Sequence, residues 1–251
     1  MKLVTLIENT ASREDLAQEH GLSLYLETGS HKILFDMGQS GAFADNAETL
    51  GIDLSAVEFA VLSHGHYDHG GGIPAFLEKN GSAPVYVNLH AFEPHFNATG
   101  KDIGLDPRLP RDRIRFVSGP LSPAPGITLH TVPFPPADTA GMTAGDGQTE
   151  DFRHEQYLLI EEAGKQILVS GCSHKGIVSI AEHFRPDILI GGFHFMKTED
   201  ETILRTAAQR LLALDCTCYT GHCTGEKQYA FLKTLMGHRL HSLTTGSQRN
   251  L

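Results

Sequence analysis

The chain has 251 residues, of which 40% are hydrophobic, and this is enough for one large domain or two small ones with a full core. Its net charge of −10 argues against nucleic acid as a partner, because non-specific binding to nucleic acid needs a basic surface. Because no apolar run is long enough to span a membrane and no signal peptide is evident, we expect a cytoplasmic protein that acts on a small molecule.

The first hundred residues are predicted to alternate strands with short helices. Residues 22–27 alternate apolar and polar side chains, and a turn at residues 28–30 joins them to a second strand, which is typical of a β-hairpin. Helices are expected at residues 42–50 and from residue 73. Strands are expected at residues 2–7, 22–27, 32–35, 59–62 and 84–87.

The second half repeats this order of elements. Helices are predicted at residues 177–184, 199–214 and 226–236, the second of them strongly amphipathic. Strands are predicted at residues 156–161, 166–169, 187–190, 216–220 and 240–244. The repetition favours an α/β protein in which residues 1–251 form a single domain with two similar halves.

Residues 97–153 are the least regular part, and we interpret them as an insertion. Two strands are expected inside it, at residues 113–117 and 127–132. Residues 133–147 are rich in Pro, Gly and small side chains, which predicts a flexible loop, and a long loop of this kind often forms a lid. Four arginines form a basic patch within the insertion: Arg108, Arg111, Arg113 and Arg115.

The richest motif lies on a loop between the buried strand at residues 59–62 and the helix that begins at residue 73. Within six residues it holds three histidines and an aspartate: His64, His66, Asp68 and His69. Imidazoles with a carboxylate are the ligands that suit zinc, so the loop predicts a metal site. One or two divalent ions are expected, with manganese or iron as alternatives to zinc.

Later strand ends also carry metal-binding side chains. Cys172 and His174 follow one strand, His194 follows another, and His222 follows a third. Because ligands gather at such ends of sheets flanked by helices, we expect these residues near the first loop. The four cysteines (Cys172, Cys216, Cys218 and Cys223) lack disulfide spacing and the C-x-x-C pattern, which favours reduced thiols over a separate zinc knuckle.

The pattern HxHxDH resembles the signature of the metallo-β-lactamase superfamily. The strings EHGLS, ILFDMG, LSHGHYDHGGG, GCSHKGI, GGFHF and GHCTG resemble a branch that contains metal-dependent hydrolases and the archaeal dihydropterin-aminobenzene-ribosyl-phosphate synthase. The resemblance covers residues 3–95 and 154–225. It implies a four-layer αββα sandwich.

The resemblance also implies roles for single residues. His64 and His66 would hold one metal, and Asp68, His69 and His222 a second, with Asp36 supporting the loop from behind. Where many relatives have a bridging aspartate, this chain has Cys172 and, two residues later, His174; we expect His174 as a ligand and keep Cys172 and His154 as further candidates. Asp68 would also orient a metal-bound hydroxide and relay its proton, and His194 would stabilise the developing oxyanion.

Three functions stay open at this point. The first is hydrolysis of an ester, lactone or phosphoester by metal-bound hydroxide. The second is a synthase-like transfer on a pterin and a phosphoribosyl substrate, whose phosphate the arginine patch would meet, although a solvated surface explains that patch as well. The third is a non-catalytic metal-binding or sensor protein on the same scaffold, since a fold does not fix a function.

Overall fold

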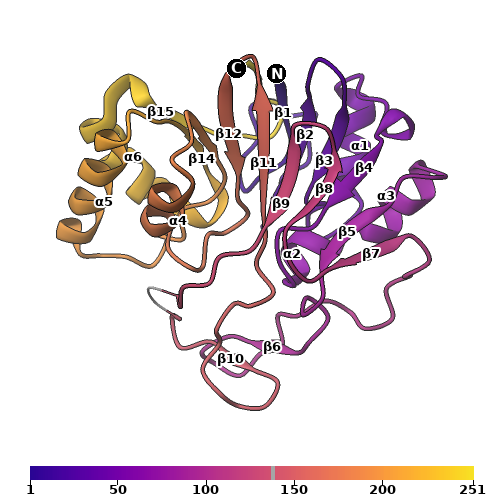
Figure 1. The fold of residues 1–251 in the computed structure, drawn as a ribbon, viewed down its shortest axis with the longest axis horizontal. Coiled ribbons are helices and arrows are strands. Elements are labelled where there is room, and N and C mark those ends of the chain that lie inside the picture. Colours follow the sequence, from indigo (N-terminus) through magenta and orange to yellow (C-terminus); the bar gives the residue numbers. More distant parts are fainter. Residues whose placement is uncertain (137–138) are drawn as a thin grey trace.

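The computed structural model describes residues 1–136 and 139–251. Two seven-stranded sheets lie face to face, and helices cover the outer face of each (Figure 1). The layers therefore run helix, sheet, sheet, helix, which confirms the predicted αββα sandwich.

The first sheet is mostly built from the first half of the chain. Its strand β2 (Ser23–Glu27) pairs antiparallel with β3 (Lys32–Phe35) as the predicted hairpin, whereas β3, β4, β5 and β7 run parallel. The carboxyl ends of β3 and β4 therefore lie side by side and carry Asp36 and the motif loop. The full order is β16 (Gln248–Asn250), β1 (Lys2–Ile7), β2, β3, β4 (Phe59–Val61), β5 (Val85–Asn88) and β7 (Ile114–Val117).

The second sheet is built from the second half of the chain together with part of residues 97–153. Its strands β12, β13, β14 and β15 run parallel, so the loops that follow them gather at one edge. Those loops carry Cys172, His174, His194 and His222. The order is β15 (Leu240–Ser242), β14 (Thr217–Thr220), β13 (Ile188–Ile190), β12 (Lys165–Val169), β11 (Tyr157–Glu162), β9 (Ile127–His130) and β8 (Leu121–Ala124).

The strand alternation explains the layers. Leu24 and Leu26 of β2 face the second sheet, while Tyr25 between them packs under the helices of the first sheet. In β11, Leu158 and Leu159 likewise face opposite layers. Helices α1 (Ala42–Thr49) and α3 (Ile73–Lys79) cover the first sheet, and α4 (Ile177–Phe184), α5 (Glu201–Ala213) and α6 (Glu226–Met236) cover the second.

The predicted insertion is more regular than its composition indicates. It supplies β7, β8 and β9 to the two sheets, and β6 (His95–Phe96) pairs with β10 (Thr143–Ala144) beside them. The loop predicted at residues 133–147 thus contains part of a strand pair, and its residues 137 and 138 lie outside the described residues. Two of the four arginines have partners of their own: Arg113 bonds to the backbone at Asn80, and Arg108 pairs with Asp106.

The short helical segments add detail that the pattern did not reveal. A single helical turn, α2 (Tyr67–Gly70), continues the motif loop, and 3-10 turns occur at η1 (Leu54–Ala56), η2 (His222–Thr224) and η3 (Gly237–Arg239). Across residues 1–136 and 139–251, the structure contains no helix with the length and apolar character that crossing a membrane requires.

Candidate metal centre

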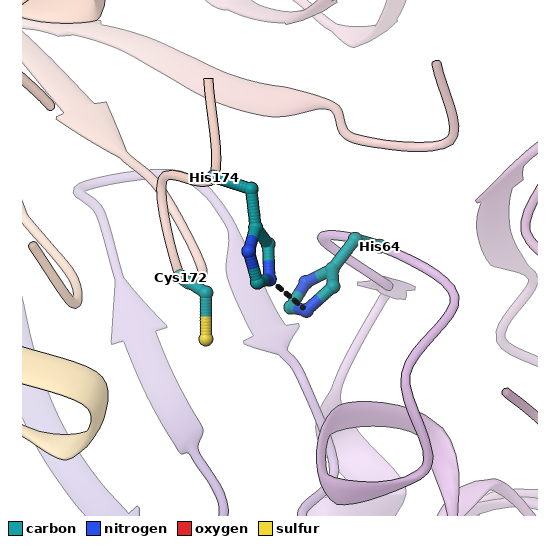
Figure 2. A group of neighbouring side chains, drawn as sticks. All are labelled: His64, Cys172 and His174. Atoms are coloured by element: carbon teal, nitrogen blue, oxygen red, sulfur yellow. Dashed lines mark hydrogen bonds between the residues drawn. The ribbon is translucent and has the colours of Figure 1, made fainter. Parts of the chain in front are cut away.

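Loops from the two sheets meet at the edge where their parallel strands end. His64 comes from the loop after β4, while Cys172 and His174 come from the loop after β12 (Figure 2). The Nε2 atoms of His64 and His174 lie 3.3 Å apart, and both rings are buried. With the Cys172 thiol, these two imidazoles form a first group of metal-binding atoms.

A second group lies beside the first. The Nε2 atoms of His69 and His222 are 3.2 Å apart, and the Asp68 Oδ2 atom is 3.3 Å from His222 and 3.6 Å from His69. The Cys172 Sγ atom lies 3.2 Å from His69 Nε2 and belongs to both groups. Cys172 thus occupies the position between the groups, where the resemblance placed a bridging aspartate.

Asp36 determines which nitrogen of two histidines carries the proton. Its carboxylate accepts hydrogen bonds from the Ser63 hydroxyl at 2.7 Å and from His69 Nδ1 at 2.6 Å. Since the Ser63 proton is used on Asp36, the Ser63 oxygen accepts from His64 Nδ1 at 2.8 Å. His64 Nε2 therefore presents a lone pair to the centre, and His69 Nε2 does so whenever that ring is neutral.

His222 is held in the same way from the N-terminal loop. Its Nδ1 atom donates to the Asn9 side-chain oxygen at 2.9 Å, and its backbone N–H donates to Glu8. The Nε2 atoms of His222 and His69 and the Asp68 carboxylate therefore face one another, so a positive charge must lie among them, either a metal ion or the proton of His69. Ligand atoms around a tetrahedral zinc ion lie about 3.3–3.4 Å apart, so these residues fit a divalent metal.

Burial and neighbouring charges keep most of these imidazoles neutral, as metal ligands must be. Burial lowers the pKa of His66 to about 3 and of His222 to about 4, and it holds the pKa values of His64 and His174 well below the usual range. His69 differs: burial opposes its charging, but Asp36 and Asp68 outweigh burial and raise its pKa to about 9.

The pKa values of two acidic groups of the site are shifted in opposite directions. Burial alone would raise the pKa of Asp68, but His69 and His222 outweigh it and hold that pKa well below its usual range. Burial and the neighbouring Cys223 raise the pKa of the Cys172 thiol well above its usual value. Asp68 is therefore an anion near neutral pH, whereas Cys172 needs a cation nearby to lose its proton.

Residues 154–156 connect the two loops. His154 Nδ1 accepts the Gly65 N–H at 2.8 Å, and the Glu155 carboxylate accepts the His174 N–H at 2.8 Å. Gln156 donates its backbone N–H to the Ser63 carbonyl at 2.8 Å and its side-chain N–H to the preceding carbonyl. We call this fully buried segment the 154–156 clamp, because it fixes both loops of the centre.

Within the clamp, the hydrogen bond from Gly65 determines the tautomer of His154. Because its Nδ1 atom accepts from Gly65, the neutral ring carries its proton on Nε2, the only other nitrogen. That arrangement leaves no lone pair for a metal and favours positioning of the motif loop. His154 also lies with His95 and Glu150 in a buried group, in which His95 Nδ1 donates to Glu150 at 2.7 Å.

The other predicted residues also lie at the centre. His66 contacts His64 and His174 with ring centroids 4.5 Å and 4.9 Å away. His194, at positive φ of 57°, lines the cleft with its ring centroid 4.3 Å from His174. The structure thus brings all the residues predicted for the site together; metal binding stays a prediction for each candidate ligand except His154, whose tautomer disfavours it.

Sequence reasoning did not single out His20. Its Nε2 atom lies 3.3 Å from Asp68 Oδ2, and its ring centroid is 4.8 Å from that of His222. The only signal in the sequence was its place within the EHGLS string, which carried the resemblance without a stated role.

A cleft of about 500 Å³ opens onto the centre. Part of its wall comes from the 97–153 segment, whose backbone bonds to the motif loop through Tyr67 N–H and the Ile103 carbonyl at 3.0 Å. A larger hollow of about 1010 Å³ adjoins it and shares His222 and residues 196–199. The four arginines of the patch do not line either hollow in the described part of the chain, whereas Lys101 and Lys197 line the cleft.

Comparison with known proteins agrees with this geometry. Residues 17–159 match a family described as the metallo-beta-lactamase superfamily. The 7,8-dihydropterin-6-methyl-4-(beta-D-ribofuranosyl)-aminobenzene-5'-phosphate synthase of Methanocaldococcus jannaschii is 29% identical over 90% of this chain and 88% of its own length.

Two solved structures share the fold. A crystal structure described as a metal-dependent hydrolase of the beta-lactamase superfamily has a TM-score of 0.82 at 24% identity, covering 100% of this chain and 99% of that one. Zn²⁺-bound PqqB from Methylobacterium extorquens has a TM-score of 0.62 at 13% identity and full coverage of both chains.

Proposed function

Since this chain belongs to the metallo-β-lactamase superfamily, we propose that it is a metal-dependent hydrolase of an ester, lactone or phosphoester. Enzymes are characteristic of the superfamily, and its members bind divalent metals, often zinc. One observation carries the proposal: the Nε2 atoms of His64, His69 and His222 and the Asp68 carboxylate are buried close to one another beside a cleft that Asp68 and His222 line.

The side chains around the cleft divide the catalytic work. A divalent cation held by these residues would polarise the scissile group and activate water. Asp68, an anion with one oxygen close to His222, would orient the attacking water and accept its proton. His194, beside His174, would donate to the oxygen that becomes negative, and loss of such a donor costs roughly 10²–10³ in rate.

The first test is metal content and metal-dependent turnover. Protein purified without added metal is analysed for elements, then stripped with a chelator and assayed on a panel of esters, lactones and phosphodiesters before and after zinc, manganese or iron is restored. We expect up to two ions per chain and turnover that returns with metal. His66→Ala should lose metal and activity together.

The outcomes separate the candidate functions. Absence of bound metal under all conditions contradicts the proposal and the site together. Stoichiometric metal without turnover on any substrate supports a non-catalytic metal-binding protein on this scaffold.

A synthase-like reaction on a pterin is the second candidate, and the size of the cavity favours it. The cleft and the hollow that adjoins it exceed together the roughly 300–1,000 Å³ of ordinary small-molecule pockets, which suits an extended substrate. The synthase from Methanocaldococcus jannaschii is similar along nearly the whole chain. Because the arginine patch lies outside both hollows, Lys101 and Lys197 are better placed to meet a phosphate.

Binding measurements decide between the two reactions. Calorimetry with a reduced pterin should show micromolar or tighter binding if the second candidate is right, without hydrolysis of the general panel. Lys197→Met should then weaken binding of a phosphorylated ligand more than that of the pterin alone. No pterin binding, together with turnover of the panel, favours the hydrolase.

A further inference from the structure

We infer that His20 is an additional metal ligand, on the cleft side of the second group formed by Asp68, His69 and His222. This inference deepens the proposed function and rests on it, because it assumes that the centre binds metal. It assigns a metal-binding role to the N-terminal loop, which lies outside the HxHxDH motif.

The distances place His20 as a ligand of the same ion. Its Nε2 atom is 3.3 Å from Asp68 Oδ2, the same distance that separates that oxygen from His222 Nε2. All three ligand atoms lie within 4.8 Å of one another. Pairs of ligands around a tetrahedral zinc ion are about 3.3–3.4 Å apart, so the distance between His20 Nε2 and Asp68 Oδ2 is that expected for two ligands of one ion.

The loop around His20 is fixed although the His20 side chain is 49% exposed. The Glu19 carboxylate accepts the backbone N–H groups of Gln39 and Ser40 at 2.9 and 3.2 Å, and the Ser40 hydroxyl at 2.6 Å. On the other side, Gly21 lies against the Asp68 carbonyl, where a Cβ atom would come within 2.6 Å. Contacts on both sides therefore hold His20 over Asp68.

The same geometry predicts how the two groups differ. With His20, the second group gains a further imidazole beside Asp68 and His222, on the side of the cleft. The first group keeps His64, Cys172 and His174, with His66 beside them, and reaches the cleft through His66 and His174.

The alternative is that His20 only donates a hydrogen bond to Asp68. The test uses His20→Phe, which keeps an aromatic ring but removes both nitrogens, and His20→Gln, which keeps a donor. His31→Phe is the matched control, because His31 is a histidine far from the cleft that pairs with Glu58. Each metal-free protein is titrated with Zn²⁺ and with Co²⁺, and the visible bands of Co²⁺ report the ligand atoms directly.

We expect His20→Phe to weaken the second equivalent of zinc more than about 100-fold, beyond the 10–100-fold typical of residues behind the ligands. The Co²⁺ bands of that equivalent should shift in both His20 variants, while the first equivalent and His31→Phe stay unchanged. Unchanged Co²⁺ bands in His20→Phe overturn the inference, whether or not the affinity falls.

The result that contradicts the proposed function differs from the result that contradicts only the role of His20. If the unaltered protein binds no Zn²⁺ or Co²⁺, both the proposed metal centre and this inference are wrong. If it binds them and His20→Phe has the same affinities and Co²⁺ bands, only the inference about His20 is wrong.

Discussion

At the scale of single residues, Asp36 controls the chemistry of the centre without facing the cleft. It holds the protons of His64 and His69 on their Nδ1 atoms, through Ser63 and directly. In Asp36→Asn the amide N–H₂ would face either the Ser63 backbone N–H or the Ser63 hydroxyl together with His69 Nδ1, so the hydrogen bonds that set the tautomer of these rings would be lost or weakened. We expect metal affinity to fall about 10–100-fold, measured by competition with a chelator.

A control separates this effect from the loss of one carboxylate. Asp53→Asn makes the same change at a surface position, where Asp53 accepts the Ser55 N–H at 2.9 Å at the start of η1. It should leave both stability and metal affinity nearly unchanged, because asparagine caps the start of a helical turn about as well as aspartate. Equal metal affinity in Asp36→Asn and the unaltered protein would show that Asp36 does not set the tautomers.

The residue types in the motif predicted which side chains come together. The sequence could not predict which ring nitrogen of each histidine carries the proton. Three imidazoles and a carboxylate at HxHxDH spacing indicate a metal site whatever their orientation. The orientation depends on Ser63, Asn9 and Asp36, which are ordinary loop residues in the sequence. His20 escaped prediction for the same reason, because its closeness to Asp68 results from loop packing.

At the scale of elements, the clamp joins the motif loop of one sheet to the Cys172–His174 loop of the other. Glu155 is buried and accepts three donors, from His174, Lys175 and Tyr157. Glu155→Gln would replace one accepting oxygen by a donor that faces other donors. We expect the free energy of unfolding to fall by about 1–3 kcal/mol, with faster amide exchange at residues 172–175.

A matched substitution at the surface tests whether the burial of Glu155 causes the expected loss of stability. Glu58 also accepts a backbone N–H, from Lys32 at 3.1 Å, but it lies at the surface. Glu58→Gln should therefore change stability by less than about 0.5 kcal/mol. If both variants lose the same stability, the clamp has no special role.

The elements themselves were largely predictable because each strand carries its own alternation. The runs at residues 22–27 and 156–161 place alternate side chains in different layers, so their pattern reflects the sandwich. Strands β6, β8, β10 and β16 escaped prediction because short or exposed edge strands show little alternation. Their existence depends on pairing with distant partners, such as β16 with β1.

At the scale of the whole molecule, the buried histidines predict how the stability of the metal-free protein depends on pH. His66 and His222 have pKa values of about 3 and 4 in the folded state, below the ordinary value near 6.5. As pH falls below about 6.5 the unfolded chain takes up protons that the folded chain refuses, so stability is lost. His69 has the opposite sign, since its folded pKa of about 9 gives stability that is lost as pH rises from about 6.5 to 9.

The metal-free protein should therefore be most stable near pH 6.5. Because one pKa unit corresponds to about 1.4 kcal/mol, each side of the maximum should fall by several kcal/mol, measured by urea unfolding in chelator at pH 5, 6.5 and 9. His222→Asn should remove part of the acid-side loss, with the rest due to His66, and His69→Asn should remove the alkaline-side loss. Equal stability at pH 5 and 6.5 would contradict the neutral, buried state of these rings on which metal binding depends.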